Sequence, residues 1–368
     1  MDILEEEREK ISEIDRKMAE LFLRRMESVR EIAIYKQERG LPVYDPAREQ
    51  QIIARNGSLI EDDLLRGYYL SFYENLLSVS KKYQHRLNEG IRVAYSGVQG
   101  AFADIAARKI FPGAECVGFD GFEDAYRSVA NGQFDCTVLP LENSYAGEVG
   151  QVMDLMFFGD LYVNGIYTLP VSHSLLAVRG SEIGGIRRIM SHPQALSQCR
   201  EYIRRHGWEE IPAGNTAEAA QKVSELDDRE TAAIASTLTA SLYGLEILDH
   251  DINSSNTNTT KFAVFSKTGH RPEGSQTCKF ILMFTVRDVA GALAKAVNVI
   301  GSHGFNLKAL RSRPVPDKDW QYYFYAEAEG DDGSDAGIRM LSELKSQCDM
   351  LKIVGRFTNE ISIKEDLM

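Results

Sequence analysis

The sequence has no long hydrophobic run and no pair of cysteines spaced to hold a metal ion. No stretch approaches the roughly 18 apolar residues of a membrane helix, and the acidic residues 1–9 do not resemble a signal peptide. Five scattered cysteines without a CxxC pair argue against a disulfide framework and a zinc site, and seven histidines also lack metal-ligand spacing. These absences favour a soluble, cytoplasmic protein without a metal ion or other cofactor.

Basic residues are in the minority. The formal net charge is −12, from 42 Lys and Arg against 54 Asp and Glu, which disfavours nucleic acid or an anionic membrane as the main partner. Cations on an apolar face are therefore informative. The length of 368 residues exceeds one ordinary core and suits two or three domains.

Residues 3–38 form an uninterrupted helical pattern without proline or glycine, which predicts a helix about 54 Å long. A helix of this length buries its apolar stripe only against other helices, which we expect to come from a second subunit. Arg25 and Lys36 lie at the same angle as the stripe, and Arg8 lies at its edge. Two unpaired cations are costly to bury, so they predict an anionic ligand. The stripe consists of Ile11, Ile14, Met18, Leu21, Phe22, Val29 and Ile32.

Two further helices are predicted, one beginning at Pro46 and one over residues 62–87. Asp45 is the expected N-cap of the first of these helices, and Arg48 and Glu49 follow in its first turn. Ser80 and Gln84 lie one turn apart beside the apolar stripe of the second.

This pattern of residues, from Arg8 to LPVYDPxRE at 41–49, resembles the all-helical chorismate mutase domain over nearly all of residues 4–88. The resemblance implies that chorismate is rearranged to prephenate. It implies that Arg8 of the partner subunit, Arg25 and Arg48 hold the two carboxylates. Lys36 and Gln84 would face the ether oxygen, Glu49 would take the ring hydroxyl, and Asp45 and Ser80 would support them. The rearrangement needs no nucleophile or proton transfer, so fixing a reactive conformer and stabilising developing charge are sufficient.

Residues 89–267 show alternating strand and helix signals, which predict an α/β fold. The glycine-containing loop at 96–100 does not match GxGxxG and has no acidic residue placed for a ribose, which excludes a dinucleotide site. The expected strands are 91–95, 116–119, 137–139, 175–178, 188–190, 232–235 and 262–265.

Three polar clusters lie at the ends of these strands. Glu142, Asn143 and Ser144 follow a strand that we expect to end at Pro140, and the other clusters are SHPQ at 191–194 and NSSNTNTTK at 253–261. Each cluster alone is typical of an ordinary loop. Together they predict the wall of a polar pocket.

The motifs ENSxxG, SHPQALxQC and the threonine-rich segment resemble prephenate dehydratase over about residues 91–266. The resemblance implies a two-lobed fold like that of periplasmic solute-binding proteins, with the active site between the lobes. It assigns the site to Glu142, Asn143, Ser144, Ser191, Gln198, Thr259 and Thr260.

The resemblance gives Thr260 the key hydroxyl for the loss of carbon dioxide and the ring hydroxyl from prephenate. A threonine hydroxyl is a weak acid, so we hypothesise that Thr260 orients the leaving group and that Glu142, if buried and protonated, supplies acidity. Lys261 stands where the family has arginine, which keeps the charge and loses the planar fork.

Residues 276–368, after a linker expected at 271–275, carry the βαββαβ order of a ferredoxin-like fold. Two motifs resemble the effector-binding motifs of the ACT domain and imply feedback inhibition by phenylalanine. Arg311 stands where the family has glutamate, so the strength and sign of that response stay open. The candidate effector residues are Gly291, Ala292, Leu293, Asn306, Leu307, Arg311, Ser312, Arg313 and Pro314.

The favoured interpretation is a multidomain, homodimeric or larger enzyme of phenylalanine biosynthesis. It has an all-α mutase domain at 1–88, a two-lobed α/β dehydratase domain at 89–267 and an α+β regulatory domain at 276–368. One alternative is a small-molecule sensor that has lost the chemistry, against which Thr260, Glu142 and Gln198 argue. Another is a dehydratase that prefers the aminated substrate arogenate.

Overall fold

The computed structural model describes residues 3–38, 46–254, 257–270, 278–316, 321–358 and 360–363. The chain divides into two compact units, Met1–Arg92 and Val93–Met368. Among the described residues, no helix combines the length and apolar character needed to cross a bilayer.

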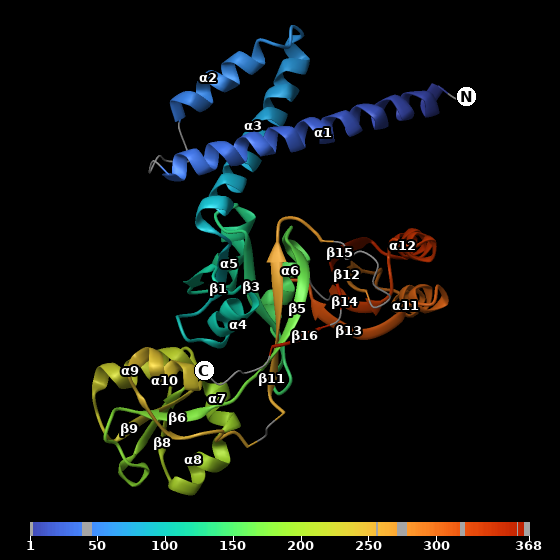
Figure 1. The fold of residues 1–368 in the computed structure, drawn as a ribbon. Coiled ribbons are helices and arrows are strands. Elements are labelled where there is room, and N and C mark those ends of the chain that lie inside the picture. Colours follow the sequence, from blue (N-terminus) through green and yellow to red (C-terminus); the bar gives the residue numbers. More distant parts are fainter. Residues whose placement is uncertain are drawn as a thin grey trace. The chain divides into compact units, whose positions relative to one another are not determined.

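The first unit is a three-helix array (Figure 1) of α1 (Ile3–Glu38), α2 (Pro46–Gly57) and α3 (Asp63–Glu89). These bounds confirm the predicted helices. Asp62 caps α3 by accepting a hydrogen bond from the backbone N–H of Leu65 at 2.9 Å. Helices α1 and α2 both pack against α3.

Most of the apolar stripe on α1 is uncovered in the single chain. Val29 is buried, whereas Ile14 and Leu21 remain 55% and 61% exposed. Exposed apolar residues on α3, including Leu65 and Phe72, add to this surface. Burial of the stripe by a second subunit therefore stays a prediction.

The second unit begins with a lobe built on a mixed sheet in the order β5-β11-β3-β1-β2. Strands β1 and β3 are parallel, and β11 runs antiparallel to both β3 and β5. Helices α4 (Phe102–Ile110), α5 (Phe122–Ala130) and α6 (Gly150–Phe158) belong to this lobe. The strands are β1 (Arg92–Ser96), β2 (Glu115–Phe119), β3 (Cys136–Asn143), β4 (Gly147–Glu148, paired with β3), β5 (Tyr162–Pro170) and β11 (Thr259–Ser266).

A second lobe is inserted between β5 and β11 and has its own sheet, in the order β10-β6-β9-β7-β8. It has a separate core, in which Leu175, Ile189 and Ile234 are fully buried. The two-lobed architecture implied by the resemblance is confirmed. The strands are β6 (Ser174–Ala177), β7 (Arg188–Ser191), β8 (Glu209–Pro212), β9 (Thr231–Ala235) and β10 (Glu246–Asp249). The helices are η1 (Ile183–Gly185), α7 (Pro193–Gln198), α8 (Arg200–His206), α9 (Thr216–Leu226) and α10 (Thr237–Tyr243).

The C-terminal region has the predicted βαββαβ order, with sheet order β13-β14-β12-β15. The linker expected at 271–275 lies outside the described residues. The elements are β12 (Lys279–Thr285), α11 (Ala292–Ser302), β13 (Asn306–Pro314), β14 (Tyr322–Glu329), α12 (Asp335–Gln347) and β15 (Met350–Phe357).

The C-terminal sheet continues into the sheet of the first lobe (Figure 1), which the sequence did not predict. Strand β15 pairs with β5 at Gly355 and Val163, and β16 (Ile361–Ser362) pairs with β5 further along. A Cβ atom at Gly355 would lie 2.4 Å from the Val163 carbonyl oxygen, so glycine is required at this junction. The two regions also share a core, in which Phe157 of α6 stacks on Tyr323 of β14 with centroids 4.2 Å apart.

Two predicted strand bounds were wrong. Strand β3 does not stop at Pro140 but continues to Asn143, and β11 begins at Thr259 rather than at residue 262. Strand β3 tolerates proline because β1 pairs only with Cys136–Val138 and because the register against β11 shifts beside Pro140. Glu142, Asn143 and Thr260 therefore lie on strands, where successive side chains point to opposite faces.

Candidate active sites

A cavity of about 430 Å³ lies between the two lobes of the second unit. The first lobe contributes aromatic and polar side chains to its wall, and the second lobe contributes amides and imidazoles. Its lining includes Phe102, Asn143, Thr260 and Phe262, together with His173, His192, Gln194 and Gln198.

Asn143 and Thr260 face each other across β3 and β11 at the cavity wall. Asn143 Nδ2 donates to Thr260 Oγ1 at 2.9 Å and to Asn258 Oδ1 at 2.9 Å. Asn143 Oδ1 accepts a bond from Gln194 Nε2 of the second lobe at 3.1 Å. The Asn143 amide thus links the two lobes, and Thr260 keeps its hydroxyl proton for another acceptor.

Gln198 joins a buried polar chain behind this pair. Its Oε1 accepts hydrogen bonds from His173 Nε2 at 2.9 Å and from Asn258 Nδ2 at 3.1 Å. His173 is 2% exposed, and burial lowers the pKa of His173 to about 4, against the smaller opposing effect of the Gln198 bond. His173 is therefore neutral near pH 7, with its proton on Nε2. The sequence prediction missed His173, and it included Gln194 and Asn258 only as members of the polar clusters at 191–194 and 253–261.

Stability should fall in acid because of His173. The folded-state pKa lies below the ordinary 6.5, so the unfolded chain takes up this proton first as pH falls. The contribution is complete above pH 6.5 and is lost between about pH 6.5 and 4, up to roughly 3 kcal/mol. Urea unfolding across this range should show a shallower loss for His173→Gln than for wild type. The exposed control His250→Gln should follow wild type, and equal slopes for all three proteins would contradict the prediction.

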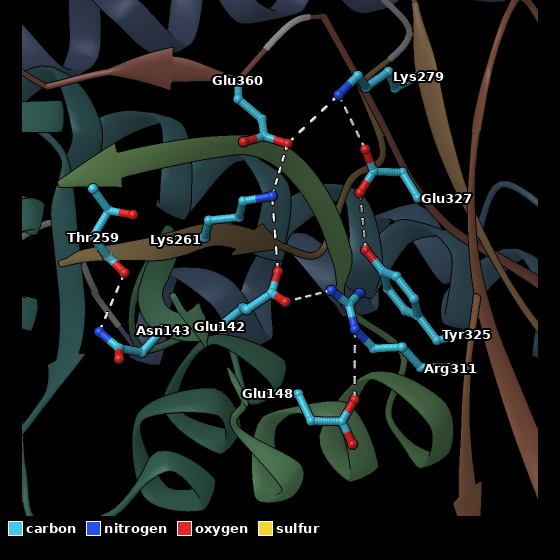
Figure 2. A network of polar contacts seen from close by, with 10 residues as sticks. All are labelled: Glu142, Asn143, Glu148, Thr259, Lys261, Lys279, Arg311, Tyr325, Glu327 and Glu360. Carbon is cyan, nitrogen blue, oxygen red and sulfur yellow. Dashed lines mark hydrogen bonds and ion pairs between the residues drawn. The ribbon is translucent and has the colours of Figure 1, made fainter. Parts of the chain in front are cut away.

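Glu142 is not among the residues that line the cavity, and its side chain is half-buried rather than buried. Its carboxylate is on the other face of β3, half-buried between two cations (Figure 2). Glu142 Oε1 lies 2.5 Å from Arg311 Nη2, and Oε2 lies 3.8 Å from Lys261 Nζ. Lys261 also points away from the cavity, towards Glu360 at 3.1 Å.

Three other predicted residues, Ser144, Ser191 and Thr259, make hydrogen bonds that hold the backbone around the site. Ser191 is fully buried and donates to the Ile234 carbonyl oxygen at 2.6 Å. Ser144 Oγ accepts from the Thr259 backbone N–H at 2.9 Å, which ties the end of β3 to the start of β11. Ser144 borders an adjoining hollow of about 310 Å³. Of the seven residues assigned by the dehydratase resemblance, the cavity gathers Asn143, Gln198 and Thr260.

In the helical unit, Arg25 of α1 reaches α3. Its guanidinium is half-buried and donates a short hydrogen bond to the hydroxyl of Ser80, a residue that is 4% exposed. One turn later, Gln84 is 8% exposed, and its Oε1 is buried without a hydrogen-bond partner among the described residues. Arg25 is bound by a hydroxyl rather than a carboxylate, so its charge is not neutralised there.

The other predicted mutase residues are less assembled in the single chain. Glu49 of α2 binds Lys81 of α3, with both carboxylate oxygens 2.9 Å from Nζ. Lys36 is half-buried, whereas Arg8 and Arg48 are exposed. Asp45 lies outside the described residues. Sequence reasoning missed Lys81, because no motif marked it.

The predicted effector motifs lie at the start of α11 and along β13. Gly291 caps α11 with φ of 81°, a left-handed conformation that favours glycine, and Ala292 and Leu293 follow. Along β13, Arg311 and Arg313 are half-buried, and Ser312 and Pro314 are exposed.

The candidate effector residues at the two ends of β13 have different contacts. Arg313 binds Asp154 of α6 at 3.2 Å and Glu148 at 3.2 Å. Burial acts to lower the pKa of Arg313, but hydrogen bonds to Asp154 and Glu148 outweigh it and raise the pKa. Asn306 donates to Glu329 Oε2 at 3.0 Å, and Leu307 packs against the core of the C-terminal region. Across the described ranges, His, Cys, Asp and Glu form no cluster of three able to hold a metal ion.

Three family models match the chain in order. Residues 7–85 match chorismate mutase type II, residues 93–270 match prephenate dehydratase, and residues 280–344 match the ACT domain. A bifunctional chorismate mutase/prephenate dehydratase of Aquifex aeolicus (strain VF5) is 30% identical over 368 residues, covering 97% of this chain and 98% of its own. Arogenate dehydratase/prephenate dehydratase 2, chloroplastic, of Arabidopsis thaliana is 32% identical over 276 residues, 73% of this chain and 72% of its own.

Solved structures resemble the second unit. A prephenate dehydratase from Arthrobacter aurescens in complex with L-Phe has a TM-score of 0.68 and 28% identity, covering 73% of this chain and 90% of its own. A structure described as GqqA, a novel type of quorum-quenching acylase, has a TM-score of 0.68 and 31% identity, covering 73% of this chain and 98% of its own. One fold thus carries two differently described activities, so the site must decide between them.

Proposed function

Since the chain belongs to the bifunctional chorismate mutase/prephenate dehydratase family, we propose that it converts chorismate to prephenate and then prephenate to phenylpyruvate. The first reaction is assigned to the helical unit and the second to the cavity between the lobes. The observation that carries the proposal is the Asn143–Thr260 pair at the wall of that cavity, in a chain of which 97% aligns with a bifunctional relative.

The mutase step is assigned to positioning and charge. Arg25, held by Ser80, binds a substrate carboxylate, together with Arg48 and Arg8 of the partner subunit. Lys36 and Gln84 face the ether oxygen, where negative charge develops as the bond breaks. Glu49 takes the ring hydroxyl, and Asp45 supports the site. Gln84 would donate to the ether oxygen through Nε2, because an amide oxygen only accepts; its buried Oε1, without a hydrogen-bond partner among the described residues, could accept from a donor of the ligand.

The dehydratase step couples two bond cleavages. As the C–CO₂⁻ bond breaks, its electrons enter the ring, and the ring hydroxyl leaves as hydroxide, which becomes water on gaining a proton from the solvent. Thr260 donates a hydrogen bond to the departing oxygen, oriented by Asn143. Gln198 holds Asn258 and His173 behind them, and Phe102 and Phe262 reduce access of water. The surrounding backbone is held by Ser144, Ser191 and Thr259. Lys261 adds positive charge on the face of β11 that points away from the cavity.

L-Phenylalanine is the proposed effector of the ACT region. The candidate set is Gly291, Ala292, Leu293, Asn306, Leu307, Arg311, Ser312, Arg313 and Pro314. Support comes from the ACT match and from the related dehydratase solved with L-Phe. The proposed sign of the response is inhibition, which the ACT resemblance implies, and Arg311 in place of glutamate leaves that sign to the assay below.

A coupled assay tests this function. Purified full-length protein supplied with chorismate should form prephenate and then phenylpyruvate, and L-phenylalanine should slow phenylpyruvate formation. A protein that binds phenylalanine but forms neither product would be a sensor. The chloroplastic relative makes arogenate the second candidate substrate. A higher kcat/KM for arogenate than for prephenate would support that alternative.

A second copy of the chain is the proposed partner for the exposed stripe of α1. The stripe is long and apolar, and Arg8 lies far along it from Arg25, which suits a site completed by another subunit. Light scattering should give a mass of at least twice the 41.3 kDa chain. Ile14→Asp should shift the protein towards the monomer and abolish mutase activity, because a charge in an apolar interface is costly. An unchanged mass for Ile14→Asp would contradict this arrangement.

A further inference from the structure

Arg311 extends from the ACT region to the first lobe. Its Nη2 donates to Glu142 Oε1 at 2.5 Å, and its Nε lies 3.7 Å from Glu148 Oε2. The guanidinium also lies over the Tyr325 ring, 5.3 Å from the centroid. The Arg311 and Glu142 side chains are only 24% and 25% exposed, so their attraction is screened less than that of a surface pair.

Glu142 is held from two sides. Its second oxygen faces Lys261 Nζ at 3.8 Å, and these two residues are directly opposite each other on β3 and β11. Lys261 is shared with Glu360, to which it is closer at 3.1 Å. Arg311 therefore makes the tightest contact on the Glu142 carboxylate (Figure 2).

The residues next to this ion pair form the cavity wall. Asn143 follows Glu142 on β3, Thr260 precedes Lys261 on β11, and both point to the face opposite the ion pair. Because side chains alternate along a strand, a shift of Glu142 would turn Asn143 relative to Thr260. The 2.9 Å bond between Asn143 and Thr260 depends on this register.

We propose that Arg311 is a positioning residue for prephenate dehydration, and the inference rests on the proposed function of the cavity. By fixing Glu142 on the outer face of the sheet, it keeps Asn143 in place to orient the Thr260 hydroxyl. A glutamate at position 311, which the ACT resemblance predicts, would instead face Glu142 and Glu148. The positive charge of Arg311, opposite in sign to that of the expected glutamate, therefore matches its acidic partners Glu142 and Glu148.

Steady-state kinetics of the full-length protein test this role. Arg311→Met should lower kcat for prephenate by roughly 10- to 100-fold, because a small misplacement of a catalytic group is enough to cost that much. KM should change little, because Arg311 does not contact the substrate. Arg311→Lys should restore most of the rate by keeping the charge. Glu142→Gln should resemble Arg311→Met, and the double variant should be no slower than either single variant.

Two controls separate positioning from general damage. Lys308→Met removes another cation of β13, one that binds Glu329 of the neighbouring strand, and should leave kcat unchanged. Mutase activity of the same samples reports on intact protein and should not change. Wild-type kcat for Arg311→Met, multiplying effects in the double variant, or a change confined to KM would overturn the inference. A wild-type protein without dehydratase activity would instead refute the proposed function.

Discussion

Replacing Thr260 with valine is expected to lower kcat for prephenate dehydration by about 10²- to 10³-fold, the usual effect of losing one hydrogen-bond donor to a transition state. Valine keeps the branched shape of threonine in the strand, so the fold should persist. The hydroxyl that Asn143 orients towards the cavity is lost. Phenylpyruvate formation from prephenate measures the loss, and chorismate consumption by the same sample should be unaffected.

The matched control is Thr168→Val. Thr168 lies on β5 opposite Lys261, outside the described lining of the cavity. Its replacement makes the same chemical change on the neighbouring strand. Similar losses in Thr168→Val and Thr260→Val would indicate damage to the sheet, and full activity of Thr260→Val would exclude the proposed role of its hydroxyl.

Replacing Arg25 with methionine is expected to lower kcat/KM of the mutase by about 10²- to 10⁴-fold, because substrate charge is both bound and stabilised by this guanidinium. The methionine side chain retains the length and apolar stem, so the packing of α1 against α3 should survive. Ser80 loses its partner, but its hydroxyl also donates to the Leu76 carbonyl oxygen at 2.7 Å. Dehydratase activity with added prephenate should be unchanged.

Arg24→Met provides the comparison. Arg24 is adjacent to Arg25 in sequence but exposed, so the Arg24→Met substitution removes the same charge from another face of the helix. It should leave mutase kinetics close to wild type. A mutase that tolerates Arg25→Met as well as Arg24→Met would show that the cation on the apolar stripe does not bind substrate.

Helix periodicity and capping fixed α1 to α3 from local information alone. The long pattern without proline or glycine and the proline at the start of α2 act within a few residues, so these helices can be predicted without knowledge of the fold. The βαββαβ order could also be predicted from local information, because each of its elements has a clear hydrophobic period. Three strands longer than two residues, β5, β8 and β10, were missed. Strand β5 includes Asn164 and Gly165, and the other two are four-residue strands with little hydrophobic alternation.

The amino-acid order alone therefore specified the three N-terminal helices, the domain order and the cavity residues Asn143, Gln198 and Thr260, because these depend on neighbours within a few positions or on short motifs. Only the tertiary structure decided which way those residues face. Strand β3 continues past Pro140, which places Asn143 in the cavity and Glu142 on the opposite side. The partner of Glu142 is Arg311, 169 residues away, and a contact at that separation is set by sheet packing that no local pattern encodes.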